Sequence, residues 1–370
     1  MIPKATKKFM DESIIVDCCI STPATYSMVA EKDMGDDYDP WTELPPSHLI
    51  VNNAELAIWG SVNFGTDVFK WPRAVHMAQE GSILLVGERG QVYYFGPRGK
   101  NRQFEEPISR DLIMGIYAIK NIHDTIYIVG TYRTVLRRDG ANQWTSITQI
   151  LEAETLKIAK KIDEKGGNFR PGFRCIDGFA ANRDLYAAGG KSDVWHYDGR
   201  DWHPVDIPLA DMQIKCICCA ADSYVYIAGR FGTLLKGQGD RWHNLTQSEL
   251  DWTDFRDMVD YQGTIYLCTE QELYTIQDDD TLQPVDFGSM GKPFSFSALY
   301  VNHGQLMVSG SFNACIYDGK QWRSLYGNTK ADEIQDFAVL NHLTDKLEDT
   351  LDSLGEVADK LKKPLDTPKP

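Results

Sequence analysis

Residues 184–205, DLYAAGGKSDVWHYDGRDWHPV, contain the pattern that repeats along this chain. An apolar run over 185–188 and an alternating run over 194–197 are followed by Asp198-Gly199 and then by a third short run that begins at tryptophan. The Asp-Gly pair favours a hairpin, because both residues tolerate the positive φ that such a turn requires. The stretch therefore predicts three short antiparallel strands joined by tight turns.

The same pattern returns five more times along the chain. The copies lie at 82–104, 125–147, 223–245 and 305–325, with a degenerate copy at 264–285. Each copy is preceded by one more short apolar run, so that a unit comprises four strands in about forty residues. Forty residues and four strands are the period of a β-propeller blade, an antiparallel sheet that repeats around a central channel.

The turn between the third and fourth strands carries Asp-Gly followed by Trp. The pairs are Asp139-Gly140 with Trp144, Asp198-Gly199 with Trp202, Asp318-Gly319 with Trp322, and a reordered Gly239-Asp240 with Trp242. In these turns the region 73–325 resembles the bacterial propeller repeats of the Asp-box and Kelch-like kind. The resemblance implies the propeller fold and does not fix a function, because one fold hosts many activities.

The two chain ends are expected to complete the ring. Residues 13–44 fit the second, third and fourth strands of a blade, and 334–340 (IQDFAVL) would supply its inner strand. We therefore predict an all-β propeller of seven blades over residues 1–341. Residues 48–72 hold a further strand pair that is too short for a full blade, which leaves eight blades as the alternative.

Two segments depart from the repeat. Residues 150–172 enlarge one interval and carry an apolar stripe at helical spacing, which predicts an inserted helix. Residues 342–363 carry a second such stripe, which predicts an amphipathic C-terminal helix that packs either on its own ring or on another chain. The proline-containing end, 364–370, is expected to be a disordered tail.

The composition restricts the classes of function. The net charge of −15 argues against a nucleic-acid binder, which normally carries a basic footprint. No apolar run approaches the length of about 20 residues that spans a bilayer, and the N-terminus lacks the pattern of a signal peptide. We therefore expect a cytoplasmic protein without a membrane partner, in which the eight cysteines are reduced. The sequence does not specify the oligomeric state.

No catalytic, metal or cofactor motif is present in the sequence. The nucleophile elbow, the phosphate-binding loop and the zinc-protease motif are all missing. Cys216 and Cys219 have C-x-x-C spacing, but on a strand these side chains point to opposite faces, so we expect buried packing rather than a metal site. We predict no catalytic residue, no metal and no cofactor.

One face of the predicted ring gathers cationic and aromatic side chains. In a propeller, the loop between the second and third strands and the connection to the next blade open on the same face. The second-to-third loops place seven candidate residues there: Arg89, Tyr132, Arg133, Lys191, Arg230, Phe231 and Phe312. Arginine beside an aromatic ring is typical of interface anchors and of anion capture, although local carboxylates such as Glu88 and Asp193 are alternative partners.

These features favour a non-enzymatic protein-binding scaffold. The acidic net charge suggests a specific form of it, an immunity or inhibitor protein that neutralises a basic toxin or effector domain. The alternative is a glycoside hydrolase or lyase that acts on an anionic sugar at the mouth of the channel. In that case Arg89, Arg133 and Arg230 would bind the substrate, with Glu270 and Tyr132 as reacting groups.

Overall fold

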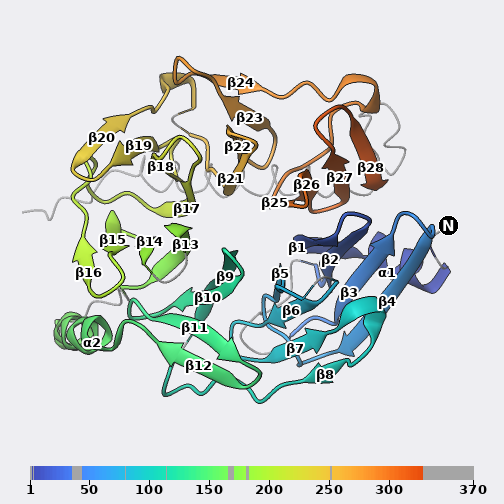
Figure 1. Cartoon of the computed structure of the whole chain (residues 1–370), viewed down its shortest axis with the longest axis horizontal. Coiled ribbons are helices and arrows are strands. Elements are labelled where there is room, and N and C mark those ends of the chain that lie inside the picture. The colour runs from blue at the N-terminus through green and yellow to red at the C-terminus, as the bar shows by residue number, and fades with distance from the viewer. Residues whose placement is uncertain are drawn as a thin grey trace, which may run out of the picture. The chain divides into compact units, whose positions relative to one another are not determined.

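The computed structural model describes residues 2, 4–35, 44–79, 81–113, 115–165, 171–180, 183–250 and 252–327. Over these residues, seven four-stranded antiparallel sheets follow one another around a ring (Figure 1). The prediction of an all-β, seven-bladed propeller is confirmed. The predicted C-terminal helix at 342–363, the tail at 364–370 and the segment 334–340 lie outside the described residues.

Each blade is built from four consecutive strands, numbered from the channel outward. Blade 1 contains β1 (Ser13–Thr22), β2 (Thr25–Lys32), β3 (Ser47–Asn53) and β4 (Ile58–Gly65). Blade 2 contains β5 (Arg73–His76), β6 (Ile83–Val86), β7 (Val92–Phe95) and β8 (Gln103–Phe104). Blade 3 contains β9 (Ile116–Ile122), β10 (Thr125–Gly130), β11 (Val135–Gly140) and β12 (Gln143–Ser146). Blade 4 contains β13 (Phe173–Ala180), β14 (Asp184–Gly189), β15 (Asp193–Tyr197) and β16 (Trp202–Pro204).

The remaining three blades follow the same order. Blade 5 contains β17 (Ile214–Cys219), β18 (Val225–Gly229), β19 (Leu234–Gln238) and β20 (Arg241–Asn244). Blade 6 contains β21 (Asp257–Tyr261), β22 (Thr264–Cys268), β23 (Leu273–Ile276) and β24 (Leu282–Pro284). Blade 7 contains β25 (Ala298–Asn302), β26 (Gln305–Gly310), β27 (Asn313–Tyr317) and β28 (Trp322–Tyr326). The helices are α1 (Lys4–Asp11), α2 (Gln149–Glu164) and the short 3₁₀ turns η1 (Pro97–Gly99), η2 (Ser248–Leu250) and η3 (Gly288–Met290).

The second strand of each blade reads as a continuous apolar run because neighbouring blades cover both of its faces. β6 is the sequence ILLV, and all four residues are buried. The apolar clusters of the core accordingly join residues of adjacent sheets: Val225 and Ile227 of blade 5 pack with Ala188 and Val194 of blade 4. A strand buried on both faces loses the alternation of a half-exposed strand, which is why short apolar runs indicated the fold here.

The glycine that ends the second strand is required by close packing. A Cβ atom built on Gly189 would overlap the carbonyl oxygen of Gly172, and one built on Gly130 would overlap that of Gly115. Both carbonyls belong to the connection that enters the same blade at its inner strand. The repeated glycine therefore marks the place where this connection passes against the second strand.

In two of the Asp-Gly turns the aspartate accepts hydrogen bonds from the backbone of its own turn. Oδ1 of Asp198 accepts hydrogen bonds from the backbone N–H groups of Arg200, at 2.8 Å, and of Asp201, at 2.9 Å. Asp318 accepts two equivalent bonds in blade 7. Local hydrogen bonding of this kind is what favours aspartate in turns.

The first blade differs from its prediction. Residues 13–16 belong to the innermost strand β1, not to a second strand, and residues 48–59 contribute to β3 and β4 of the same blade. All four strands of this sheet come from residues 13–65. The repeat spacing failed here because the segment between β2 and β3, residues 33–46, is much longer than the same loop in the other blades.

Blade 1 and blade 7 meet by packing and by a few hydrogen bonds. The N–H of Ile15 donates to the carbonyl of Ser311 at 2.8 Å, and Nδ2 of Asn302 donates to the carbonyl of Ile20 at 2.9 Å. Ile20, Met28 and Met307 share one buried cluster across this junction. In the described residues the ring therefore closes between two complete blades, which we call the closing junction.

Candidate functional site

The second-to-third loops and the blade-to-blade connections lie on one face, which we call the loop face. Backbone hydrogen bonds join the two kinds of segment in successive blades. The N–H of Tyr132 donates to the carbonyl of Pro171 at 2.8 Å, and the N–H of Arg230 donates to that of Gln213 at 3.1 Å. The predicted inserted helix is α2, which lies in the connection from blade 3 to blade 4, at the outer edge of the ring in Figure 1. Because this connection begins and ends at the loop face, we assign α2 to that face.

Arg133 links neighbouring parts of the structure through its hydrogen bonds. Its Nε and Nη2 donate to the two carboxylate oxygens of Asp193 at 2.7 and 2.9 Å, and its Nη1 donates to Oγ1 of Thr155 at 3.3 Å. Its guanidinium carbon also lies 5.1 Å from the ring centre of Trp195. A bidentate Arg–carboxylate pair fixes geometry strongly. Arg133 therefore joins blade 3, blade 4 and α2, and the alternative partner expected from the sequence, Asp193, occupies it.

The other predicted cations differ in their surroundings. Arg230 is half exposed and lies 3.1 Å from Oδ2 of Asp254, with its guanidinium 5.0 Å from the ring centre of Phe231. Arg89 and Lys191 are exposed. Glu88, a second expected carboxylate partner, pairs with Lys70 at 3.0 Å instead.

The predicted aromatic residues also lie in loops of this face. Phe231 is 55% exposed, whereas Tyr132 and Phe312 are partly buried. The ring of Phe312 lies 6.5 Å from that of Phe294, a residue of the connection from blade 6 to blade 7. Since the predicted residues come from loops of five different blades, the structure distributes them around the loop face and does not gather them into one cluster.

Exposed apolar side chains concentrate on the loop face. Eight of the eleven exposed large hydrophobic residues of the described chain lie there: Met34, Trp71, Ile150, Leu156, Ile158, Phe231, Trp252 and Phe294. Trp252 is 92% exposed, in the connection from blade 5 to blade 6. The sequence analysis did not identify Trp252, because it considered only the second-to-third loops of this face. A tryptophan in a connection rich in polar residues would have indicated an exposed aromatic side chain.

Phe231 and Trp252 belong to loops that are bonded to each other. The N–H of Gly232 donates to the carbonyl of Thr253 at 2.6 Å, and the N–H of Phe231 donates to Oδ1 of Asp254 at 3.3 Å. We call Arg230, Phe231 and Trp252 the blade-5 patch. Two exposed aromatic rings beside an arginine have the composition of an interface anchor.

The channel forms a cavity of about 490 Å³ between the inner strands. Side chains near the beginning of several inner strands line it. Tyr117, Arg174 and Lys215 are the second residues of β9, β13 and β17, and Arg256 immediately precedes β21. The lining also includes carboxylates of three inner strands, Asp17 of β1, Asp177 of β13 and Asp257 of β21. Sequence reasoning did not identify these cations, because it treated the inner strands as core. The residues assigned to the hydrolase or lyase alternative, Arg89, Tyr132, Arg133, Arg230 and Glu270, are not among those that line this cavity.

A hydrogen-bonded row crosses the same cavity. The hydroxyl of Tyr300 lies 2.7 Å from the ring atom Nδ1 of His76, and it accepts a hydrogen bond from the backbone N–H of His76 at 2.9 Å. On the other side of the ring, Nδ2 of Asn121 lies 3.1 Å from Nε2 of His76. Burial lowers the pKa of His76 to about 4. His76 is therefore neutral at pH 7 and joins three inner strands.

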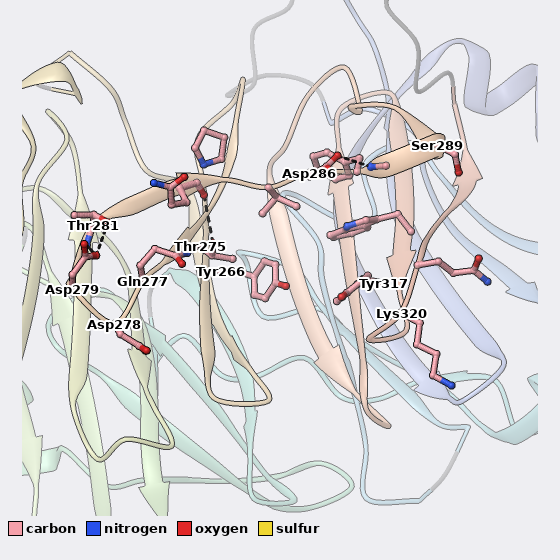
Figure 2. Close-up of a pocket in the computed structure, with 17 residues that line it drawn as sticks. Tyr266, Thr275, Gln277, Asp278, Asp279, Thr281, Asp286, Ser289, Tyr317 and Lys320 are labelled. Carbon is pink, nitrogen blue, oxygen red and sulfur yellow. Dashed lines mark hydrogen bonds between the residues drawn. The ribbon is translucent and has the colours of Figure 1, made fainter.

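A second hollow, of about 980 Å³, lies between blades 6 and 7 (Figure 2). Tyr266 and Tyr317 lie in its middle, with acidic side chains toward its ends. Two of these acids accept hydrogen bonds within their own turns. Asp279 accepts one from the hydroxyl of Thr281 at 2.6 Å, and Asp286 accepts one from the backbone N–H of Gly288 at 2.8 Å. They therefore stabilise the loops that border the hollow.

The cysteines behave as small apolar residues. All eight thiols are unbonded to one another, and seven are buried. Cys216 and Cys218 pack in the core between blades 5 and 6, whereas Cys219 contacts the core between blades 4 and 5, so the predicted opposite orientation is confirmed. Burial raises the pKa of each of these three thiols.

Within the described residues, no group of three or more His, Cys, Asp or Glu residues is placed to hold a metal ion. Neither α1 nor α2, nor any other helix of that part of the chain, has the length and apolar character needed to cross a membrane.

Comparison with known proteins gives one similar sequence and many similar folds. The chain is 29% identical over 283 residues to the Immune protein Tsi7 of Pseudomonas aeruginosa, covering 75% of this chain and 87% of that protein. No family model matches the chain. YCF48 from Cyanidioschyzon merolae has a TM-score of 0.58 at 12% identity, covering 82% of this chain and 95% of that one. A catalytically inactive virginiamycin B lyase from Staphylococcus aureus has a TM-score of 0.57 at 7% identity, covering 80% and 92%. These structures show the fold alone, so the chain is a β-propeller by structure and is similar to Immune protein Tsi7 in sequence.

Proposed function

We propose that this chain is a non-enzymatic protein-binding propeller that acts as an immunity protein, neutralising a toxin by binding it. The observation that carries the proposal is the similarity to the Immune protein Tsi7, which extends over 87% of that protein. A rigid ring whose loops vary in sequence suits such a task, because binding residues concentrate in loops held by a rigid scaffold. The neighbours in fold include a lyase, but at 7% identity that likeness concerns the propeller alone.

The loop face is the proposed binding surface. Its support is the concentration of exposed apolar side chains there, with the blade-5 patch of Arg230, Phe231 and Trp252 as the proposed anchor. Fully desolvated aromatic and arginine side chains at the centre of an interface carry most of the binding free energy. Arg89, Lys191 and the exposed side of α2 would lie around this anchor.

The toxin is proposed to carry positive charge. The net charge of −15 would accelerate the encounter with a basic partner, as electrostatic steering does in other complexes. Raising the salt concentration is then expected to slow association more than it speeds dissociation.

The test is protection against a candidate toxin, which is taken from the proteins encoded near this chain or from a protein that co-purifies with it. Wild-type protein should form a complex with the purified toxin and rescue growth when the two are co-expressed. The double variant Phe231→Glu, Trp252→Glu should bind at least about 100-fold more weakly, because charge at an interface anchor costs several kcal/mol. Calorimetry gives the affinity, and growth gives the protection.

Leu56→Glu is the matched control. Leu56 is also an exposed apolar residue, 67% accessible, but it lies in the β3–β4 turn on the opposite face. It should bind like wild type. If wild type neither binds nor protects, the immunity function is wrong. If the double variant binds as tightly as Leu56→Glu, the function stands and the blade-5 patch is not its anchor.

A further inference from the structure

The mouth of the channel on the loop face gathers more positive than negative charge. Arg174 and Lys215 are the second residues of β13 and β17, the inner strands of neighbouring blades, and Arg256 immediately precedes β21 of the next blade. All three line the channel cavity of about 490 Å³. Each of these strands starts at the loop face, so the three cations lie around the same opening.

Two of these cations have no carboxylate partner in the described chain. Arg256 pairs with Glu270 at 2.5 Å, and Arg230 nearby pairs with Asp254 at 3.1 Å. Among the described residues, no carboxylate lies within ion-pair distance of Arg174 or Lys215. Both side chains are exposed to the opening.

Arg174 is held in place by an aromatic ring. Its guanidinium carbon lies 4.0 Å from the ring centre of Tyr117, which comes from the inner strand of the preceding blade. A guanidinium stacked on one ring keeps its N–H groups at its edge, available to an anion. The tyrosine thus orients the arginine and leaves its donors unused.

The surroundings of Lys215 are those of a cation that lacks a counter-ion. Burial first, and then the charges of Arg174, Arg230 and Arg256, lower its pKa, while only Asp254 acts in the opposite direction. A bound anion would relieve this repulsion and stabilise the charged amine.

The carboxylates deeper in the channel are already used. Oδ2 of Asp177 accepts the N–H of Cys219 at 3.1 Å, and Oδ2 of Asp257 accepts the N–H of Leu299 at 2.8 Å. Lys120 lies 3.4 Å from Asp177. Backbone N–H groups and Lys120 therefore occupy these acids, and neither acid forms an ion pair with Arg174 or Lys215.

We infer that the mouth of the channel is an anion-binding site, in which Arg174, Lys215 and Arg256 take a carboxylate or phosphate group and Tyr117 orients Arg174. The anion is either a small free one or an acidic side chain of a bound chain, since both present the same oxygen atoms to the cations. The inference does not depend on the proposed immunity function.

The experiment uses the full chain and three probes at low ionic strength. These are inorganic phosphate, pyrophosphate and a short peptide with two adjacent glutamates. Calorimetry and the shift in melting temperature should show saturable binding of at least one probe. Arg174→Gln with Lys215→Gln should weaken that binding at least about tenfold, because a charge-assisted hydrogen bond contributes roughly 1.5–3 kcal/mol.

Arg89→Gln with Lys191→Gln is the matched control. It removes the same charge from exposed positions of the loop face that do not line the cavity, and binding should remain within about twofold of wild type. If the first double variant does not fold, Lys215→Gln alone replaces it, with an expected loss of at least about threefold.

The three probes also identify the source of the anion. Binding of phosphate or pyrophosphate alone indicates a small free anion, and binding of the peptide alone indicates an acidic side chain. The absence of saturable binding to all three overturns the inference. An equal loss in both double variants overturns it as well, because only general attraction would then be at work.

Discussion

Partly or fully buried carboxylates in the blades differ in whether their oxygen atoms have hydrogen-bond partners. Asp17 accepts the N–H of Cys18 at 2.9 Å through one oxygen and the N–H of Ala74, in the next blade, at 2.8 Å through the other. Asp177 and Asp257 join neighbouring inner strands in the same way. Glu31 in β2 is different, because it is only 5% exposed and its Oε1 has no hydrogen-bond partner. A buried carboxylate oxygen without a partner costs free energy.

The cost of Glu31 should appear in the pH dependence of stability. Burial raises its pKa to about 7, against a lowering effect of Arg73. The folded state therefore holds this proton more tightly than the unfolded state, and the stability it contributes is lost as pH rises from about 4.5 through 7. Glu31→Gln should gain on wild type over that range, by up to about 3 kcal/mol at pH 8, since one pKa unit corresponds to about 1.4 kcal/mol.

Urea unfolding of both proteins at several pH values measures this difference. The exposed Glu106 offers a control, since Glu106→Gln should follow the wild-type profile. A constant difference between Glu31→Gln and wild type across the range would mean that Glu31 does not titrate there.

At the level of elements, the insertion α2 owes its position to a residue outside it. Its own contacts with the ring include the buried Leu151, Thr155 and Ala159, while Ile150 on the same helix is 76% exposed. Arg133 adds a hydrogen bond to Thr155 and the ion pair to Asp193. With only part of its apolar surface covered, a helix of this size depends on such ties.

Replacing Arg133 by Met should loosen α2 without unfolding the ring. The variant loses a bidentate pair whose side chains are 16% and 13% exposed. Asp193 keeps the bond from the indole N–H of Trp195, which donates at 2.8 Å and is its one other side-chain donor among the described residues. Amide exchange over residues 149–164 should accelerate at least about tenfold, equivalent to about 1.4 kcal/mol. Lys157→Met, at an exposed position of the same helix, should leave exchange unchanged. Equal protection in the two variants would show that packing alone holds α2.

At the scale of the molecule, the sequence predicted features that depend on neighbouring residues, and it did not predict contacts between residues far apart in the chain. The strands, the Asp-Gly turns and α2 follow from patterns within a few residues, and all three are present. The partner of Arg133 lies 60 residues further along the chain, and the cations of the channel mouth come from three separate blades. No local pattern in the sequence predicts which residues of different blades lie next to each other in space. The strands of blade 1 were mispredicted for a related reason, because one long loop in this blade broke the period used to count strands.

Truncation tests whether the seven described blades suffice. A chain that ends at Gly327 retains all twenty-eight strands. It should unfold cooperatively, with a melting temperature within a few degrees of that of the full chain, because the described part of the chain already forms apolar clusters within and between its seven blades. Calorimetry compares the two proteins. Loss of the cooperative transition would show that residues 328–370 complete the ring, as the sequence-based closure through 334–340 required.

The closing junction also determines how long blade 1 waits for its partner blade during synthesis. The side of blade 1 that buries Ile20 and Met28 finds its cover only in blade 7, which begins at Ala298, more than 230 residues after blade 1 ends at Gly65. At a translation rate of 5–20 residues per second, this apolar surface of blade 1 stays exposed to solvent in the nascent chain for roughly 10 to 50 s. A ribosome-bound intermediate of this kind is a natural client for chaperones. Overproduction should therefore yield aggregates before it yields misassembled rings.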